Sequence, residues 1–161
     1  MLSKKIFHFT MKSIENIYNI IYMHKSKYNI SDYKYIHDLN TRFRDIDAFG
    51  HVNNAVYASY IETARVELLN SWDIPRSNVG KSIIMASLKI DYYSQVQHPS
   101  LLTLGQKVVR LGKTSFDIET IIYNKKQDDI ICSAKAVIVC FDFSTQTPVK
   151  LYDSIINAYE G

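Results

Sequence analysis

The chain has 161 residues, of which 47% are hydrophobic and 22% are charged, and its formal net charge is +3. These values are typical of one globular domain that buries its own core, without metal or disulfide support. The charge is too small to indicate a nucleic-acid-binding protein, which needs a clustered basic face. No apolar run approaches the length of a membrane span, so we expect a cytoplasmic protein.

Residues 1–35 differ in composition from the rest, with six lysines and no arginine. The segment has isoleucines at helical spacing, namely Ile14, Ile17 and Ile21, which predict a short basic amphipathic helix. Three interpretations stay open: a tail, a targeting segment, or sequence upstream of a true start at Met23. Transit peptides favour arginine, so we expect a tail or a mis-assigned start, followed by one domain over residues 36–161.

Residues 36–46 read as a strand that enters a polar turn, and a long helix follows. Asn53 or Asn54 is a good N-cap for this helix. Beyond the cap, apolar residues recur at helical spacing: Val56, Tyr57, Tyr60, Ile61, Ala64 and Leu68. The helix should end near Trp72, before Pro75.

The hydrophobic period then changes to two, which predicts strands. The predicted strands cover residues 82–93, 101–111, 114–124 and 129–143. Short links between consecutive strands favour an antiparallel sheet. One helix covers only one face of such a sheet, so the other face or an edge should pair with a second subunit. Cys132 and Cys140 fall about 26 Å apart along one strand, too far for a disulfide.

The loop over residues 45–54 joins the first strand to the helix and concentrates the chemistry. A helix N-terminus has unpaired N–H groups that suit a developing oxyanion. Gly50 allows a substrate to approach the backbone closely, and Asp47 is near enough to act as a base or nucleophile. The alternative is structural: Asp47 and Asn54 as turn and cap residues, and His51 as a surface turn residue.

The same loop carries a longer pattern. It reads Asp-x-x-Gly-His-Val-Asn-Asn-x-x-Tyr from Asp47, followed by Tyr-x-Glu-x-x-Arg from Tyr60. This pattern resembles the signature of the 4-hydroxybenzoyl-CoA thioesterase-like branch of the hotdog acyl-CoA thioesterases, and weaker similarity extends over residues 36–152. The resemblance implies an α+β hotdog fold, in which a five-stranded antiparallel sheet wraps around a long central helix.

The resemblance also implies roles for residues of the loop. Asp47 matches the family's catalytic carboxylate. Gly50, His51 and Val52 match the stretch whose backbone amides lie at the thioester carbonyl. Asn54 stands where some relatives carry a histidine, which leaves His51 or Asn54 as a positioning group in the catalytic set.

The family's sites form between subunits, so parts of residues 92–97 and 111–116 should come from the neighbouring chain or line the pantetheine tunnel. The candidate substrate-binding residues are Tyr57, Tyr92, Arg110, Lys113 and Ser115. Arg110, Lys113 and Lys89 are candidates for the CoA phosphates. For Tyr57 the alternative is a core residue, and for the three cations an ordinary solvated charge.

The resemblance therefore implies an enzyme that hydrolyses a fatty or aromatic acyl-CoA to free acid and CoA. It would need no cofactor or metal and would form a homodimer or homotetramer. The alternatives are an acyl-carrier-protein thioesterase and a non-catalytic acyl-CoA-binding protein. Relatives often have proline where Gln95 stands and Gly-Asp in place of Pro99 and Ser100, so the substrate preference is left open.

Overall fold

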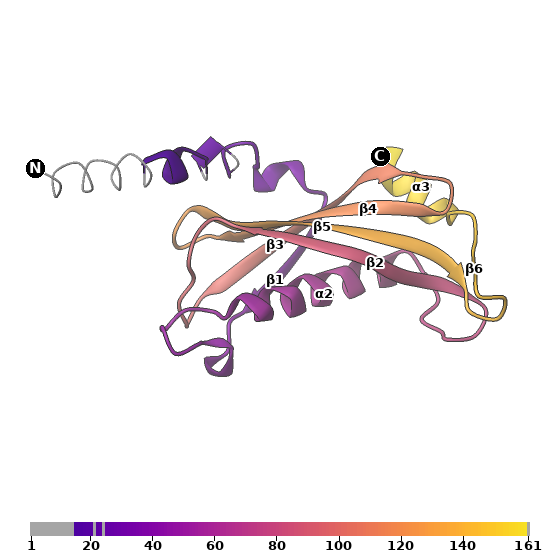
Figure 1. The fold of residues 1–161 in the computed structure, drawn as a ribbon, viewed down its shortest axis with the longest axis horizontal. Helices are drawn as coiled ribbons and strands as arrows, with labels where there is room; N and C mark the ends of the chain where they lie inside the picture. Colours follow the sequence, from indigo (N-terminus) through magenta and orange to yellow (C-terminus); the bar gives the residue numbers. More distant parts are fainter. Residues whose placement is uncertain (1–14, 21, 24, 161) are drawn as a thin grey trace, which may run out of the picture.

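A computed structural model of the protein describes residues 15–20, 22–23 and 25–160 (Figure 1). The elements after residue 29 are, in chain order, η1 (Ile30–Asp32), β1 (Tyr35–Asn40), η2 (Phe43–Asp45), α2 (Asn54–Ser71), β2 (Lys81–Tyr92), β3 (Leu101–Leu111), β4 (Ser115–Asn124), β5 (Asp129–Asp142), β6 (Thr147–Pro148) and α3 (Asp153–Glu160). This order confirms the predicted strand, long helix and four long strands. The short elements β6 and α3 were not predicted.

The sheet is antiparallel throughout, with the strand order β1-β3-β4-β5-β2 and β6 added to β5. The predicted α+β fold, with a five-stranded antiparallel sheet around one long helix, is confirmed. β1 ends at Asn40, earlier than predicted, because the side chain of Asp45 accepts from the backbone N–H of Arg42 and closes a tight turn there. β2 forms one edge of the sheet.

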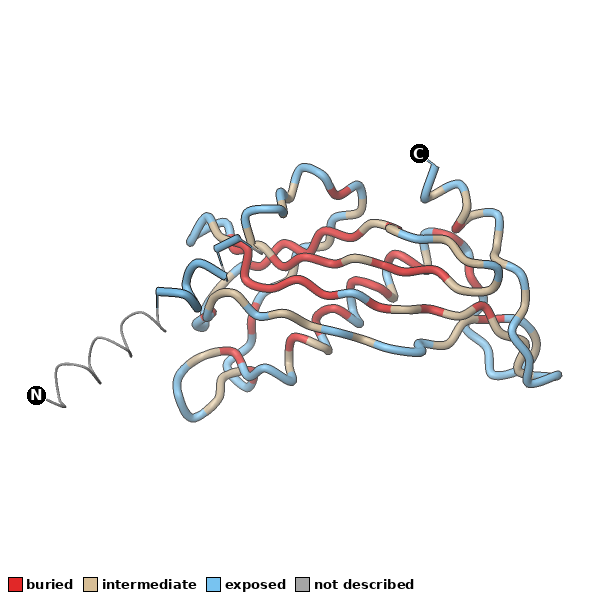
Figure 2. Tube along the Cα trace, turned by 45° about the horizontal axis from the view of Figure 1, so that its top comes forward, coloured by how far each residue is buried: buried red, intermediate tan, exposed pale blue. Residues whose placement is uncertain are grey.

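Helix α2 lies across the concave face of the sheet (Figure 1). It begins at the predicted cap, where the Asn53 side chain accepts a hydrogen bond from the amide of Ala55. Its buried face is the apolar stripe of the sequence, with Tyr57, Tyr60 and Ile61 each at most 3% exposed. Figure 2 shows that burial is concentrated where this helix meets the central strands. Packing of the stripe, more than helix propensity, therefore holds α2 in place.

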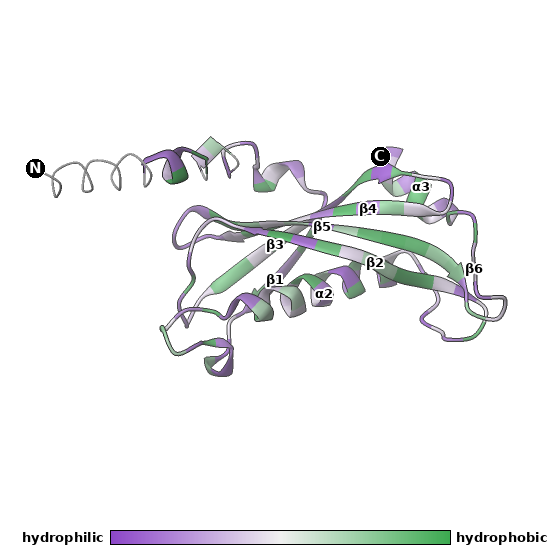
Figure 3. Ribbon diagram, in the orientation of Figure 1, coloured by the Kyte–Doolittle hydropathy of each residue, from purple (hydrophilic) through white to green (hydrophobic). Residues whose placement is uncertain are grey.

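Residues 28–33 lie on the opposite, outer face of the sheet. Tyr33 is buried there with Ile121 and Ile130, and Tyr28 and Ile30 pack around them. The hydropathy colouring of Figure 3 shows apolar residues along the strands that this segment and α2 cover. Contact with the sheet thus begins before residue 36.

The predicted N-terminal helix falls partly outside the described residues, since Ile14 and Ile21 are not among them. Residues 15–20 are helical and exposed. Cys132 and Cys140 are both buried and free, which confirms that they do not pair with each other. Within the part of the chain that the structure describes, no helix is both long and apolar enough to cross a membrane.

Candidate active site

The loop between β1 and α2 is anchored by a buried carboxylate. Asp45 is 2% exposed. Its side chain accepts hydrogen bonds from the Arg42 backbone amide at 2.7 Å and from the Tyr60 hydroxyl at 2.5 Å. The Arg42 guanidinium lies 3.1 Å from the Asp45 carboxylate. The backbone carbonyl of Asp45 accepts a hydrogen bond from the Asn53 amide. Asp45 therefore ties the start of the loop to α2.

Asp47, two residues later, lies at the base of a tight turn. Its amide donates to the His51 carbonyl at 2.8 Å, and the Gly50 amide donates back to the Asp47 carbonyl at 3.1 Å. Gly50 has a φ of 81°, a backbone conformation that favours glycine. A bridge between Ile46 and Val52 closes the turn. The loop is thus a small, hydrogen-bonded unit.

The Asp47 carboxylate is half-buried, and its two oxygens have different surroundings. Its Oδ1 accepts from the Phe49 amide at 2.8 Å and from the His51 amide at 3.4 Å. Within the described part of the chain, Oδ2 accepts no hydrogen bond. One oxygen therefore sets the orientation of the group, and the other is available to a water or a substrate.

Two of the predicted oxyanion donors, the amides of Gly50 and Val52, are engaged in this structure. The Gly50 amide donates to Asp47, and the Val52 amide donates to the Val96 carbonyl at 2.8 Å. The amide of His51, which was also predicted, and that of Asn54 are better placed to bind an oxyanion. The His51 amide has only its long contact to Asp47, and the Asn54 amide is the first of α2, where amides have no partner within the helix.

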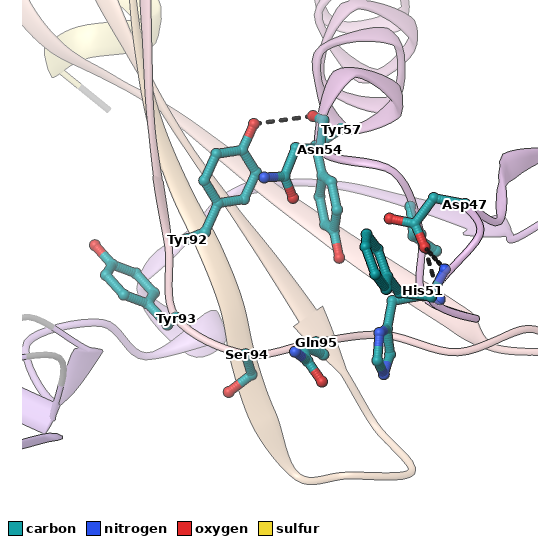
Figure 4. Close-up of a pocket in the computed structure, with 10 residues that line it drawn as sticks. Asp47, His51, Asn54, Tyr57, Tyr92, Tyr93, Ser94 and Gln95 are labelled. Atoms are coloured by element: carbon teal, nitrogen blue, oxygen red, sulfur yellow. Dashed lines mark hydrogen bonds between the residues drawn. The ribbon is translucent and has the colours of Figure 1, made fainter. Parts of the chain in front are cut away.

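A cavity of about 600 Å³ opens beside the loop (Figure 4). Its lining residues are Asp47, Phe49, His51, Val52, Asn54, Tyr57, Tyr92, Tyr93, Ser94 and Gln95. They come from the loop, the first turn of α2, and the end of β2 with the segment after it. The predicted residues Asp47, His51, Val52, Asn54, Tyr57 and Tyr92 are thus brought to one cavity, and Gly50 lies within the loop that borders it.

Two tyrosines form the wall between α2 and β2. The rings of Tyr57 and Tyr92 meet edge to face with their centroids 5.4 Å apart. The Tyr92 hydroxyl donates to the Asn54 backbone carbonyl at 2.9 Å. Burial raises the pKa of both phenols, so both stay neutral near neutral pH. Tyr57 is 2% exposed, so it serves the core and the cavity at once.

His51 and Asn54 border the cavity without pairing with Asp47 through their side chains. The imidazole of His51 points away from the Asp47 carboxylate, toward Gln95 (Figure 4). Asn54 meets Tyr92 through its backbone carbonyl. Asp47 is thus the one carboxylate among the described residues that line the cavity.

Three predicted substrate-binding residues lie elsewhere. Arg110, Lys113 and Ser115 are at the turn between β3 and β4, next to α3 and at the opposite end of the sheet from the loop (Figure 1). Arg110 is bound to Asp117 at 2.5 Å. None of the three lines the cavity of its own chain, so a role in binding requires a second chain. Lys89 likewise pairs with Asp91.

Phe49 is a lining residue that the sequence patterns did not single out. It is 85% exposed beside Asp47. The sequence did contain a signal for this residue, namely a large apolar side chain between the aspartate and the glycine of a predicted turn. Among the residues that the structure describes, no group of three or more His, Cys, Asp or Glu side chains could hold a metal ion.

Comparisons with known proteins bear on this site. Residues 41–158 match the model of a family described as the thioesterase-like superfamily. The long-chain acyl-CoA thioesterase FadM of Escherichia coli (strain K12) is 25% identical over 115 residues, 70% of this chain and 87% of that protein. A chloroplastic acyl-acyl carrier protein thioesterase of Arabidopsis thaliana is 27% identical over 124 residues, 74% of this chain and 65% of that protein.

Solved structures share the fold. A thioesterase from Thermus thermophilus, solved as a complex with coenzyme A and Zn, superposes with a TM-score of 0.68 at 25% identity. The match covers 78% of this chain and 97% of that chain. The family match over residues 41–158 takes in α2, the loop before it and strands β2 to β6.

Proposed function

We propose that this chain, which belongs to the thioesterase-like superfamily, hydrolyses acyl-CoA thioesters in the cavity beside Asp47. The observation that carries the proposal is the difference in hydrogen bonding between the two oxygens of the Asp47 carboxylate. Its Oδ1 is held by backbone amides, while its Oδ2 is available at a cavity next to the N-terminus of α2. Thioester hydrolysis needs this combination of an activating carboxylate and backbone donors.

Two routes fit this geometry. As a general base, Asp47 takes a proton from water while the oxygen attacks the thioester carbon. As a nucleophile, it attacks the carbon itself and forms an acyl-enzyme anhydride, which water then hydrolyses. In both routes the C–S bond breaks and the sulfur leaves as CoA thiolate, which takes up a proton. The His51 and Asn54 amides would stabilise the oxyanion, with support from the dipole of α2.

The walls of the cavity fit an apolar acyl group. Phe49, Tyr57 and Tyr92 present aromatic surface on the side of α2 and β2. Aromatic side chains contribute large apolar contact areas and accept straight or ring-containing groups. The FadM relative acts on long-chain acyl-CoA by name, which supports a fatty acyl group without excluding an aromatic one.

Thiol release from matched thioesters tests the proposal. We expect the full-length protein to release free thiol from CoA thioesters faster than from carrier-protein thioesters of the same acyl group. A carrier-protein relative makes the comparison necessary. Faster release from the carrier-protein thioester would indicate an acyl-carrier-protein thioesterase. Tight binding of acyl-CoA without thiol release would indicate a non-catalytic binding protein.

We also expect a homodimer or homotetramer. β2 is a 12-residue edge strand, and such an edge presents unpaired backbone groups to a second chain. A second chain could also bring Arg110 or Lys113 to the CoA phosphates. Sedimentation should give a mass of two or four chains of 18.6 kDa, whereas a single-chain mass would contradict this expectation. A cytoplasmic location stays a prediction, which cell fractionation would test.

A further inference from the structure

We propose that residues 25–33, here called the N-terminal strap, position the wall of the active-site cavity formed by Tyr92–Gln95. The inference rests on the proposed function, because it takes the cavity beside Asp47 as the substrate site. The strap lies before residues 41–158, which match the family.

The strap is anchored on the outer face of the sheet by Tyr33, which is 5% exposed. The Tyr33 hydroxyl donates to Glu119 at 2.8 Å, and the Lys107 ammonium lies 4.4 Å from the centre of its ring. Gly105 makes room for it, since a Cβ there would lie 2.7 Å from the Tyr33 Cβ and 2.9 Å from Ile30. The absence of a side chain at Gly105 thus allows Tyr33 and Ile30 to pack closely against β3.

From this anchor the strap reaches the cavity wall through Lys25 and Tyr28. Lys25 forms an ion pair with Asp129 at the start of β5, and its ammonium lies 3.4 Å from the Ser94 hydroxyl. The Ser94 hydroxyl donates to the same Asp129 at 2.5 Å. Ser94 is therefore held between a strap residue and the sheet.

Tyr28 supports the neighbouring position of the wall. Its ring lies 6.2 Å from that of Tyr93, centre to centre, a typical distance for an aromatic pair. The Tyr93 hydroxyl also hydrogen-bonds the Ser133 hydroxyl at 2.6 Å. Ser94 and Tyr93 are lining residues of the cavity, so two consecutive wall residues contact the strap.

The other side of the wall is tied to the catalytic loop. The Tyr92 hydroxyl donates to the Asn54 carbonyl, and the Val96 carbonyl accepts from the Val52 amide. The wall is thus fixed between the strap on the outer face and the loop that holds Asp47. It supplies no reacting group, so loosening it should weaken substrate binding more than it slows the chemical step.

The partial burial of the ion pair makes it a sensitive point. The side chains of Lys25 and Asp129 are 24% and 23% exposed. Replacing one partner leaves a poorly solvated charge beside Ser94. A serine hydroxyl both donates and accepts, so an ion pair with exchanged charges can keep both of its contacts with Ser94.

Charge reversal tests the proposal in the full-length chain. For Lys25→Glu and Asp129→Lys singly, we expect a rise in KM of about fivefold with kcat unchanged within about twofold. The double variant should return KM to within about twofold of the wild-type value. Lys126→Glu, an equal charge reversal on the exposed turn before β5, serves as the control and should leave both parameters unchanged.

A rise in KM at constant kcat supports positioning, because a general loss of folded protein would lower the apparent kcat and leave KM unchanged. Recovery in the double variant then assigns the effect to the ion pair. Should the reversals not fold, Lys25→Met against Lys126→Met carries the same test on KM. An unchanged KM in the Lys25 variants overturns the inference. A fall in kcat as large as the rise in KM also overturns it. A wild-type protein without thiol release would instead refute the proposed function.

Discussion

Replacing Asp47 by asparagine is expected to lower kcat for acyl-CoA hydrolysis by about 10³-fold, the range typical of losing a general base or nucleophile. Asparagine keeps the size of the side chain and an oxygen in place of Oδ1. It can still accept from the Phe49 amide, as aspartate does at 2.8 Å. The turn should therefore persist while the charge at Oδ2 is lost.

Stability separates this effect from misfolding. We expect the Asp47→Asn protein to unfold at the same urea concentration as the wild type, within the error of the measurement. Asp73→Asn is a matched control, because Asp73 is an exposed aspartate at the other end of α2 with a φ of 54° that asparagine tolerates. Near-normal thiol release by the Asp47→Asn protein would refute the catalytic assignment.

Asp45→Asn should have the opposite result, a large loss of stability. The Asp45 carboxylate accepts from Tyr60 and from two groups of Arg42. An amide in its place turns an NH₂ group toward one of these donors, so either the buried Tyr60 hydroxyl or a donor of Arg42 loses its acceptor. We expect the free energy of unfolding in urea to fall by about 3 kcal/mol, with Asp47→Asn as the matched control from the same loop.

The pH dependence of this loss has a definite sign. Burial alone would raise the pKa of the Asp45 carboxyl, but hydrogen bonds from Tyr60 and Arg42 outweigh it and hold that pKa below its ordinary value. Such a carboxyl stabilises the fold above the unfolded-state pKa of about 3.9, and its contribution is lost as the pH falls through the folded-state pKa.

The stability difference between wild type and Asp45→Asn should therefore be largest near neutral pH and shrink below about pH 4. Urea unfolding at a series of pH values measures it. A difference that stays constant down to about pH 2, or that grows on acidification, would contradict the structural role of the ionised carboxylate.

Much of the fold could be predicted because its signals are local. The cap at Asn53 and the helical spacing of Tyr57, Tyr60 and Ile61 lie within a few residues of the contacts they make. The strands of the sheet likewise follow from a period of two and from the turns between them. The early end of β1 was not predictable, because it depends on how the Asp45 side chain meets Arg42.

The division of labour between Asp45 and Asp47 required the tertiary structure. Both are aspartates of one loop, and spacing alone does not say which is buried. Tyr60 reaches Asp45 from α2, 15 residues along the chain. This contact makes Asp45 the buried aspartate of the loop. The resemblance to the family pointed to Asp47, and the geometry adds a physical reason for that choice.

The contacts made by the N-terminal strap were also beyond the sequence. Tyr33 meets Glu119 across 86 residues, and Lys25 meets Ser94 across 69. No local period reports such pairs. The lack of arginine led us to expect a tail or a mis-assigned start, and in the structure Tyr28 and Tyr33 of this segment pack against the sheet. The same holds for the amide of Val52, which is engaged by Val96 from another segment.

The central claim is that the thioester is held and broken beside Asp47. A crystal structure of the Asp47→Asn protein with an acyl-CoA that it hydrolyses slowly tests this most directly. We predict the thioester carbonyl oxygen within hydrogen-bond distance of the His51 or Asn54 amide, with the carbonyl carbon facing residue 47. A thioester bound away from this loop, with residue 47 facing solvent, would contradict the account.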